Sequence, residues 1–352
     1  MPKVFSINVE KIGRMPFFDF LKMFAMFMVL WGHCIQHLQT GEVWNEPMHK
    51  FIYTFHLPLF MMIAGFFSLS SFRLNFKQLL IKKGCQLLLP CITWGFILYI
   101  VIAIMNLCMG AFLSYSPFFV FFQHFWFLKS LFLCYLIAFV GGKLTKNIWI
   151  WGLLTLGVAH ISTTHQLPIM YFSFLIGILL RYNFDKFKAH YKSVTVISSL
   201  IFLLILFISH GDLPLKGVNY IDIISTCSIT PPICEYMNKL AISASSGLFF
   251  IGLCYWLCKN NRIEDWMCRT FMTDMGKYTL GIYIIQSIIL ETVMAEYIKV
   301  DSYGGIFSNL RFDIFILFPL VSFILMIVFT YMTKRIQVYK NLSFWLLGKS
   351  KN

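Results

Sequence analysis

Long apolar stretches divide this chain of 352 residues and leave few folds open to it. A helix that crosses a lipid bilayer needs about 20 mainly apolar residues. Ten stretches approach this length, and the fifth and sixth are short enough to be half-spans. They are Phe17–Leu38, Lys50–Phe72, Gly84–Leu107, Phe118–Gly142, Asn147–His160, Pro168–Arg181, Ser193–Ser209, Leu240–Cys258, Thr279–Ile298 and Phe312–Thr333. The pattern predicts an all-α polytopic membrane protein, a bundle of about ten transmembrane helices.

Composition excludes a soluble enzyme and a disordered chain. Hydrophobic residues make up 59% of the chain and charged residues 12%, whereas a soluble domain is close to half apolar and a quarter charged. The lipid bilayer is therefore the expected partner. The net charge of +14 does not indicate a nucleic acid partner, because the Lys and Arg residues lie in short loops and form no continuous stripe.

Basic residues alternate along the loops. The gaps after even-numbered stretches are rich in Lys and Arg, as in residues 73–83 and 181–192, whereas residues 108–117 carry no charge. The positive-inside bias then predicts that both termini lie in the cytoplasm. We expect one integral membrane domain over residues 1–340, followed by a short basic tail over residues 341–352. No cleavable signal peptide is expected, because the first stretch starts late and lacks a small-residue cleavage site.

Ionisable side chains inside the first stretch are candidates for function, because such groups are costly in a bilayer. This stretch holds Asp19, Lys22, His33 and His37. Lys22 and His33 are eleven residues apart, close to three helical turns, so they share one face. Asp19 can pair with Lys22 at the i,i+3 spacing, which is a structural role. His37 follows His33 by one turn and alternatively lies at the outer headgroup level.

Other stretches add His56, His124, Lys129, Gln286 and Glu291. Lys129 is predicted to lie about ten residues from either end of its span, so it needs a counter-ion or a water-filled cavity. For His124, beside an aromatic cluster, we favour a helix–helix hydrogen bond.

Cysteine and histidine spacing predicts no metal site. Most cysteines lie inside the apolar stretches. Cys227 and Cys234 fall in the longest outer loop, where a disulfide and two free thiols are both open readings.

Five segments, in order along the chain, carry a resemblance. The first segment runs from Lys22 to His33, which enclose ten residues. The second lies in the next stretch and consists of Phe55–Phe60 with Ala64-Gly65-Phe66-Phe67. The other three are Lys82–Pro90, Phe125–Leu128 and Gly276–Gln286. Together they resemble the acyltransferase family 3 membrane proteins. This chain has Lys22 where the family usually has Arg, Ala64 for Ser, Gln86 for Arg, and Gln286 where the family often has His.

The resemblance implies a membrane O-acyltransferase. The expected reaction moves an acyl group, usually acetyl from acetyl-CoA, to a hydroxyl of a glycan or glycolipid at the cell envelope. His33 would act as the base or carry the acetyl group covalently. Lys22 would bind a CoA phosphate or the pantetheine arm and so serve catalysis. Lys129 would stabilise the oxyanion or hold an anionic acceptor.

Further binding roles follow from the same resemblance. Arg73, Lys82 and Lys83 are expected to contact the nucleotide phosphates, although membrane topology alone also accounts for these charges. Trp126 would pack against pantetheine or a sugar face. On the acceptor side we expect four residues, namely His56, His37, Gln286 and Glu291. The expected location is the plasma (inner) membrane of a bacterium.

Two other classes of protein stay open on the sequence. A multi-span transporter or flippase of a lipid-linked sugar or small solute would also place His and Lys inside spans. A membrane sensor or scaffold would use the polar face only for packing. The sequence does not identify the acceptor, the acyl chain length or the oligomeric state.

Overall fold

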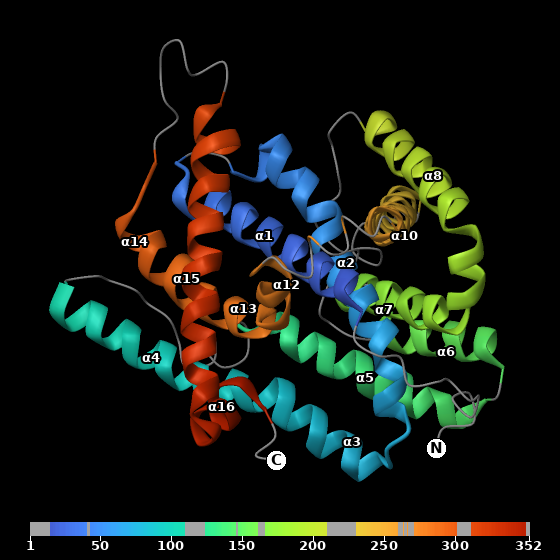
Figure 1. Ribbon diagram of the computed structural model, residues 1–352, viewed down its shortest axis with the longest axis horizontal. Helices are drawn as coiled ribbons and strands as arrows, with labels where there is room; N and C mark the ends of the chain where they lie inside the picture. The colour runs from blue at the N-terminus through green and yellow to red at the C-terminus, as the bar shows by residue number, and fades with distance from the viewer. Residues whose placement is uncertain are drawn as a thin grey trace. The chain divides into compact units, whose positions relative to one another are not determined.

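A computed structural model describes residues 15–40, 43–109, 124–145, 147–160, 166–209, 230–259, 263, 266, 271–300 and 311–349. Within these ranges the structure is helical (Figure 1), apart from an isolated bridge between Gln39 and Val300. The elements are α1 (Pro16–Leu38), the 3₁₀ turn η2 (Val43–Asn45), α2 (Pro47–Phe72), α3 (Phe76–Lys83), η3 (Gly84–Leu88), α4 (Leu89–Met109), α5 (Trp126–Leu144), α6 (Ile148–His160), α7 (Leu167–Tyr182), α8 (Phe184–Ile208), α10 (Thr230–Cys258), α12 (Phe271–Lys277), α13 (Thr279–Ile288), η5 (Ile289–Met294), α14 (Ala295–Tyr297), η7 (Asp313–Leu317), α15 (Phe318–Val338) and α16 (Lys340–Leu347). The segments η3, η5 and η7 are π-helical.

The helices confirm the predicted fold class. Among the described residues, eight helical segments are long and apolar enough to cross a membrane, and α6 and α7 are shorter apolar helices. These ten segments correspond to the ten predicted stretches. The helix α8 begins at Phe184, earlier than the predicted Ser193, and is kinked at His190. The charged first part lies before the kink, and the predicted apolar stretch follows it. The predicted start of the fourth span at Phe118 lies outside the described residues.

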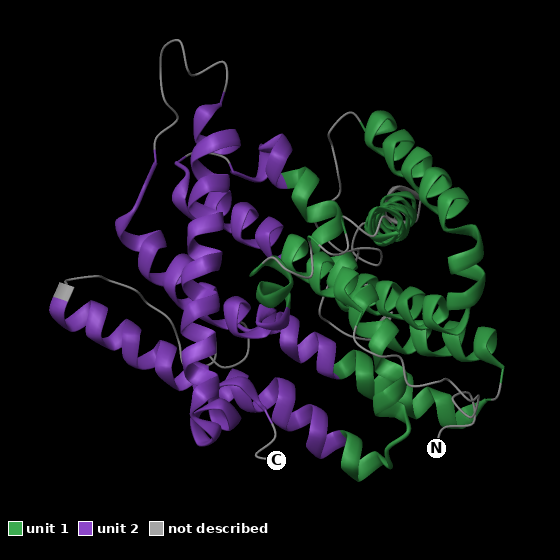
Figure 2. Cartoon of the chain, in the orientation of Figure 1, with its two compact units in different colours: residues 1–25, 50–79, 133–276 green, residues 26–49, 80–132, 277–352 purple. Residues whose placement is uncertain are grey.

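The chain divides into two compact units (Figure 2). Unit 1 holds residues 1–25, 50–79 and 133–276, and unit 2 holds residues 26–49, 80–132 and 277–352. The predicted tail begins one residue after the start of α16. In unit 2 the Trp94 indole donates to the carbonyl of Leu346 at 2.7 Å, so part of the tail packs on α4.

Unit 1 contains an aromatic core and two very close helix contacts. Phe18, Phe66 and Phe184 are buried in the core. The helices α2 and α7 approach so closely that a Cβ built on Gly65 would lie 2.0 Å from the carbonyl oxygen of Phe174, and one on Gly177 would lie 2.0 Å from that of Met62. Small residues permit such close helix packing inside membranes. The glycine in the segment Ala64-Gly65-Phe66-Phe67 therefore has a packing role.

Candidate active site

The second half of α1 belongs to unit 2 and is anchored there at several points. The Trp31 indole donates to the carbonyl of Ile314 at 2.9 Å. The main-chain amide of Val300 donates to the carbonyl of Leu38 at 2.7 Å, and the Lys299 ammonium donates to the carbonyl of His37 at 3.0 Å. These bonds hold the last turns of α1, which carry His33 and His37.

A π-helical turn brings a carboxylate toward α1. In η5 the backbone bonds span five residues instead of four, a pattern that often occurs at functional sites. Glu291 lies in this turn, and the Gln286 amide donates to Glu291 Oε1 at 2.8 Å. Gln286, which is fully buried in α13, therefore holds the carboxylate in place.

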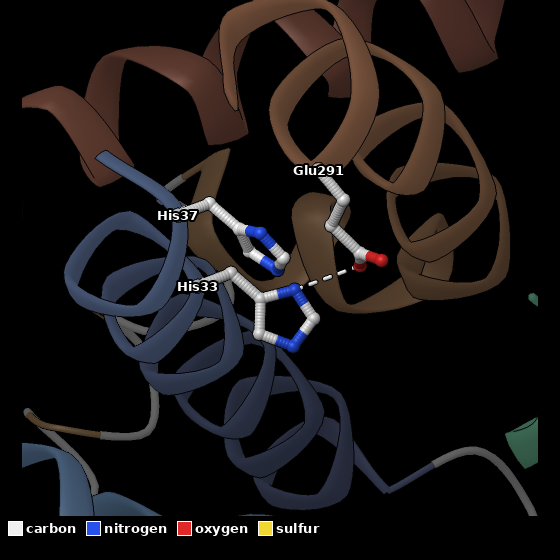
Figure 3. A group of neighbouring side chains, drawn as sticks. All are labelled: His33, His37 and Glu291. Carbon is white, nitrogen blue, oxygen red and sulfur yellow. Dashed lines mark ion pairs between the residues drawn. The ribbon is translucent and has the colours of Figure 1, made fainter. Parts of the chain in front are cut away.

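His33 faces both of these side chains, as Figure 3 shows for Glu291. Its Nδ1 lies 2.8 Å from Glu291 Oε1 and 3.1 Å from Gln286 Oε1. Both partners are acceptor oxygens, so Nδ1 carries the hydrogen, and in the neutral imidazole Nε2 then has the lone pair. The second ring nitrogen points away from the carboxylate (Figure 3). A carboxylate that fixes the tautomer of a histidine in this way prepares the other ring nitrogen to act as a base.

Solvent or a ligand can reach this group. The side chains of His33 and Glu291 are 16% and 17% exposed. The His37 ring lies one turn from the His33 ring, with centroids 5.7 Å apart. The structure thus brings together four sequence-predicted residues, namely His33, His37, Gln286 and Glu291. Gln286 and Glu291, expected on the acceptor side, contact His33 itself.

In unit 2, His124 makes a hydrogen-bonded contact with Ser287, a partner that was not predicted. Ser287, next to Gln286 in α13, has its Oγ 3.0 Å from His124 Nε2, and the Ser287 carbonyl lies 3.2 Å from the same nitrogen. This contact agrees with the expected hydrogen-bonding role of His124. Ser287 carries no signal in the sequence, because only its position beside Gln286 could have indicated it.

Other predicted residues lie in unit 1. Lys22 forms an ion pair with Asp19, with Nζ and Oδ1 2.7 Å apart, as the i,i+3 spacing predicts. His56 is buried, and its Nδ1 donates to the carbonyl of Ile52 on its own helix at 2.7 Å. Arg73 follows α2 and is exposed. The binding roles of these residues stay predictions.

The remaining predicted residues lie in unit 2. Lys82 and Lys83 end α3, the first exposed and the second half-buried. Trp126 begins α5 and is exposed. Lys129 is half-buried in the first turn of α5 rather than near the middle of a span, because the described helix starts at Trp126. Lys129 therefore lies closer to the end of its helix than the sequence predicts.

A partly buried ionic cluster in unit 2 also escaped sequence reasoning. Arg311 Nη1 lies 2.8 Å from Glu46 Oε2, and Arg311 Nε lies 3.6 Å from Asp313 Oδ1. Glu46 is far from Arg311 along the chain, so no local spacing indicated that contact. Among the cysteines, Cys234 is an exposed free thiol, and Cys227 lies outside the described residues.

Comparison with known proteins defines the class of protein. The acyltransferase domain of the acyltransferase 3 family matches residues 15–347. The chain therefore belongs to this family, and together with its apolar helices this makes it a membrane acyltransferase.

Two relatives carry the name Nodulation protein NolL. The protein from Mesorhizobium japonicum is 26% identical over 288 residues, which cover 77% of this chain and 75% of the relative. The protein from Sinorhizobium fredii is 36% identical over 81 residues, which cover 22% of each chain. No solved structure matches this chain.

Proposed function

We propose that this protein transfers an acetyl group from acetyl-CoA to a hydroxyl of a cell-envelope glycan or glycolipid. The hydrogen-bonded group of His33, Glu291 and Gln286 carries the proposal, since it places a histidine with a fixed tautomer in a partly exposed position of an acyltransferase domain. Acyl transfer to an alcohol needs such a base.

In the proposed step, His33 Nε2 takes the proton of the acceptor hydroxyl while the hydroxyl oxygen attacks the thioester carbonyl carbon. The carbon–sulfur bond breaks, the ester forms, and the imidazolium returns the proton to the CoA thiolate. Glu291 stabilises the imidazolium through its contact with Nδ1. In this scheme the chain itself makes the transfer.

Positive groups would serve the donor. Nucleotide phosphates need cations or N–H donors, and the end of α3 offers Lys82 and Lys83, with Arg73 after α2 and Lys22 in α1. Lys129 would stabilise the oxyanion, and Trp126 would pack on pantetheine. His56 and His37 are proposed to contact the acceptor. The basic loops support an orientation in the plasma (inner) membrane with both termini on the cytoplasmic side. Acetyl-CoA is available on that side.

Labelled acetyl-CoA tests the proposal. Membranes containing the chain should transfer label from the acetyl group into the envelope glycan or glycolipid fraction. Lys129→Met should abolish this transfer at matched amounts of folded protein. Solute movement without release of CoA would instead establish a transporter and overturn the proposal.

A further inference from the structure

Three side chains at the candidate active site form a group that is suited to a metal ion. One ligand atom from each of His33, His37 and Glu291 lies within 4.8 Å of the other two, and Figure 3 shows the two imidazoles and the carboxylate directed toward one another. The histidines are four residues apart on one helix, so their rings project from the same face. Sequence spacing missed this group, because Glu291 is distant along the chain.

The hydrogen bonds leave His37 available for a ligand. Its main-chain carbonyl accepts from Lys299, but within the described part of the chain its imidazole has no hydrogen-bond partner. All three side chains of the group are partly exposed, so an ion can enter. Gln286 holds the carboxylate of Glu291, as residues around metal ligands commonly do.

The donor set selects the kind of ion. Two imidazole nitrogens and one carboxylate oxygen suit Zn²⁺, which often takes three protein ligands of these types and keeps a fourth position open. Mg²⁺ and Ca²⁺ prefer sets made only of oxygen. We propose that His33, His37 and Glu291 form a reversible Zn²⁺ site and that the bound ion inhibits the enzyme.

Inhibition follows from the shared residues. An ion bound to His33 and Glu291 separates the two groups whose hydrogen bond sets the tautomer of His33. The imidazole then donates its electron pair to the metal and cannot take a proton through the same arrangement. The inhibitory role rests on the proposed function, whereas the metal site itself does not.

Direct binding tests the site. The full chain, purified in nanodiscs through a tag without histidine and stripped with EDTA, is titrated with Zn²⁺, and bound metal is measured by mass spectrometry. Saturation near one ion per chain is expected. His37→Ala should weaken binding at least about tenfold, and the matched control His190→Ala, which removes an exposed imidazole on α8, should bind like the native chain. Unsaturable binding, or equal binding by His37→Ala, would overturn the proposal.

Two further measurements separate the site from its effect. Co²⁺ in place of Zn²⁺ should give visible absorption that Glu291→Gln weakens, and an unchanged spectrum would count against Glu291 as a ligand. Zn²⁺ should suppress acetyl transfer by the native chain, and EDTA should restore it. Transfer that requires Zn²⁺ would overturn the inhibitory role. Metal binding without any acetyl transfer would contradict the proposed function and leave the site intact.

Discussion

His33 in unit 2 and His56 in unit 1 are both histidines inside predicted spans, but they make different hydrogen bonds. His33 bonds side chains from a separate segment, Glu291 and Gln286, whereas His56 donates to the carbonyl of Ile52 one turn away on its own helix. A carboxylate partner stabilises a charged imidazole, and a backbone carbonyl does so less. The comparison teaches that the partner, more than burial, indicates which histidine is suited to proton transfer.

The surroundings of the two histidines also differ: those of His56 include close helix packing, and those of His33 are polar. The helix α2, which carries His56, packs at Gly65 against the backbone of α7. The site around His33 instead contains polar side chains and a π-helical turn. We therefore expect substitutions near His33 to change the rate and substitutions along α2 near Gly65 to change stability.

Within this comparison, the largest expected effect tests His33 as the base. His33→Ala should lower acetyl transfer by about 10²–10⁴-fold, the range that a positioned base contributes. The assay is label transfer from acetyl-CoA at matched protein amounts, with His190→Ala as the control. Transfer at the native rate by His33→Ala would remove the basis of the comparison.

Glu291→Gln tests whether the negative charge of Glu291, the partner of His33, contributes to the rate of acetyl transfer. The amide can still accept the hydrogen bond from His33, but it no longer stabilises the imidazolium. A charge-assisted bond contributes about 1.5–3 kcal/mol, so the rate should fall roughly 10–150-fold. Steady-state kinetics should show the loss in kcat. A raised KM with native kcat would instead give Glu291 the acceptor-binding role predicted from the sequence.

Gly65→Ala tests the packing of α2 in unit 1. The added methyl group would meet the Phe174 carbonyl oxygen, and overpacking of this kind typically costs about 1–3 kcal/mol. Thermal unfolding in detergent should shift to lower temperature. Gly157→Ala is the matched control, because a Cβ there meets nothing within 4 Å. Equal melting of the two variants would show that α2 and α7 can separate at little cost.

The smallest effect on the rate is expected for Gln286→Leu, which tests how much Gln286 contributes to the site. Gln286→Leu keeps the side chain buried but removes the amide that bonds Glu291 and His33. The substitution removes the bonds to both residues but leaves the direct contact between His33 and Glu291. We therefore expect only about 1 kcal/mol of lost positioning in the transition state, a loss of roughly fivefold in rate. A loss as large as that of His33→Ala would make Gln286 as important as the base.

Several contacts of the site could be predicted from local spacing, and others could not. The Asp19–Lys22 ion pair follows from the i,i+3 spacing of one helix. The pairing of His33 with Glu291 joins residues on segments far apart along the chain. The polar character of Glu291 marked it as a candidate, but its partner depended on the π-helical turn. The residue pattern does not predict a π-helical turn, because such a turn only adds one residue to an ordinary helical sequence.

The sequence by itself determined the membrane-spanning helices. A bilayer offers no water to backbone groups, so each long apolar stretch must satisfy its own hydrogen bonds as a helix, and the ten predicted stretches correspond to helices of the structure. Only the tertiary structure decided which costly polar residues meet. Helix packing placed His33 against Glu291 and Gln286, whereas His56 donates to the carbonyl of Ile52 on its own helix. Contacts between helices depend on the register between them, which the apolar pattern of each helix does not specify.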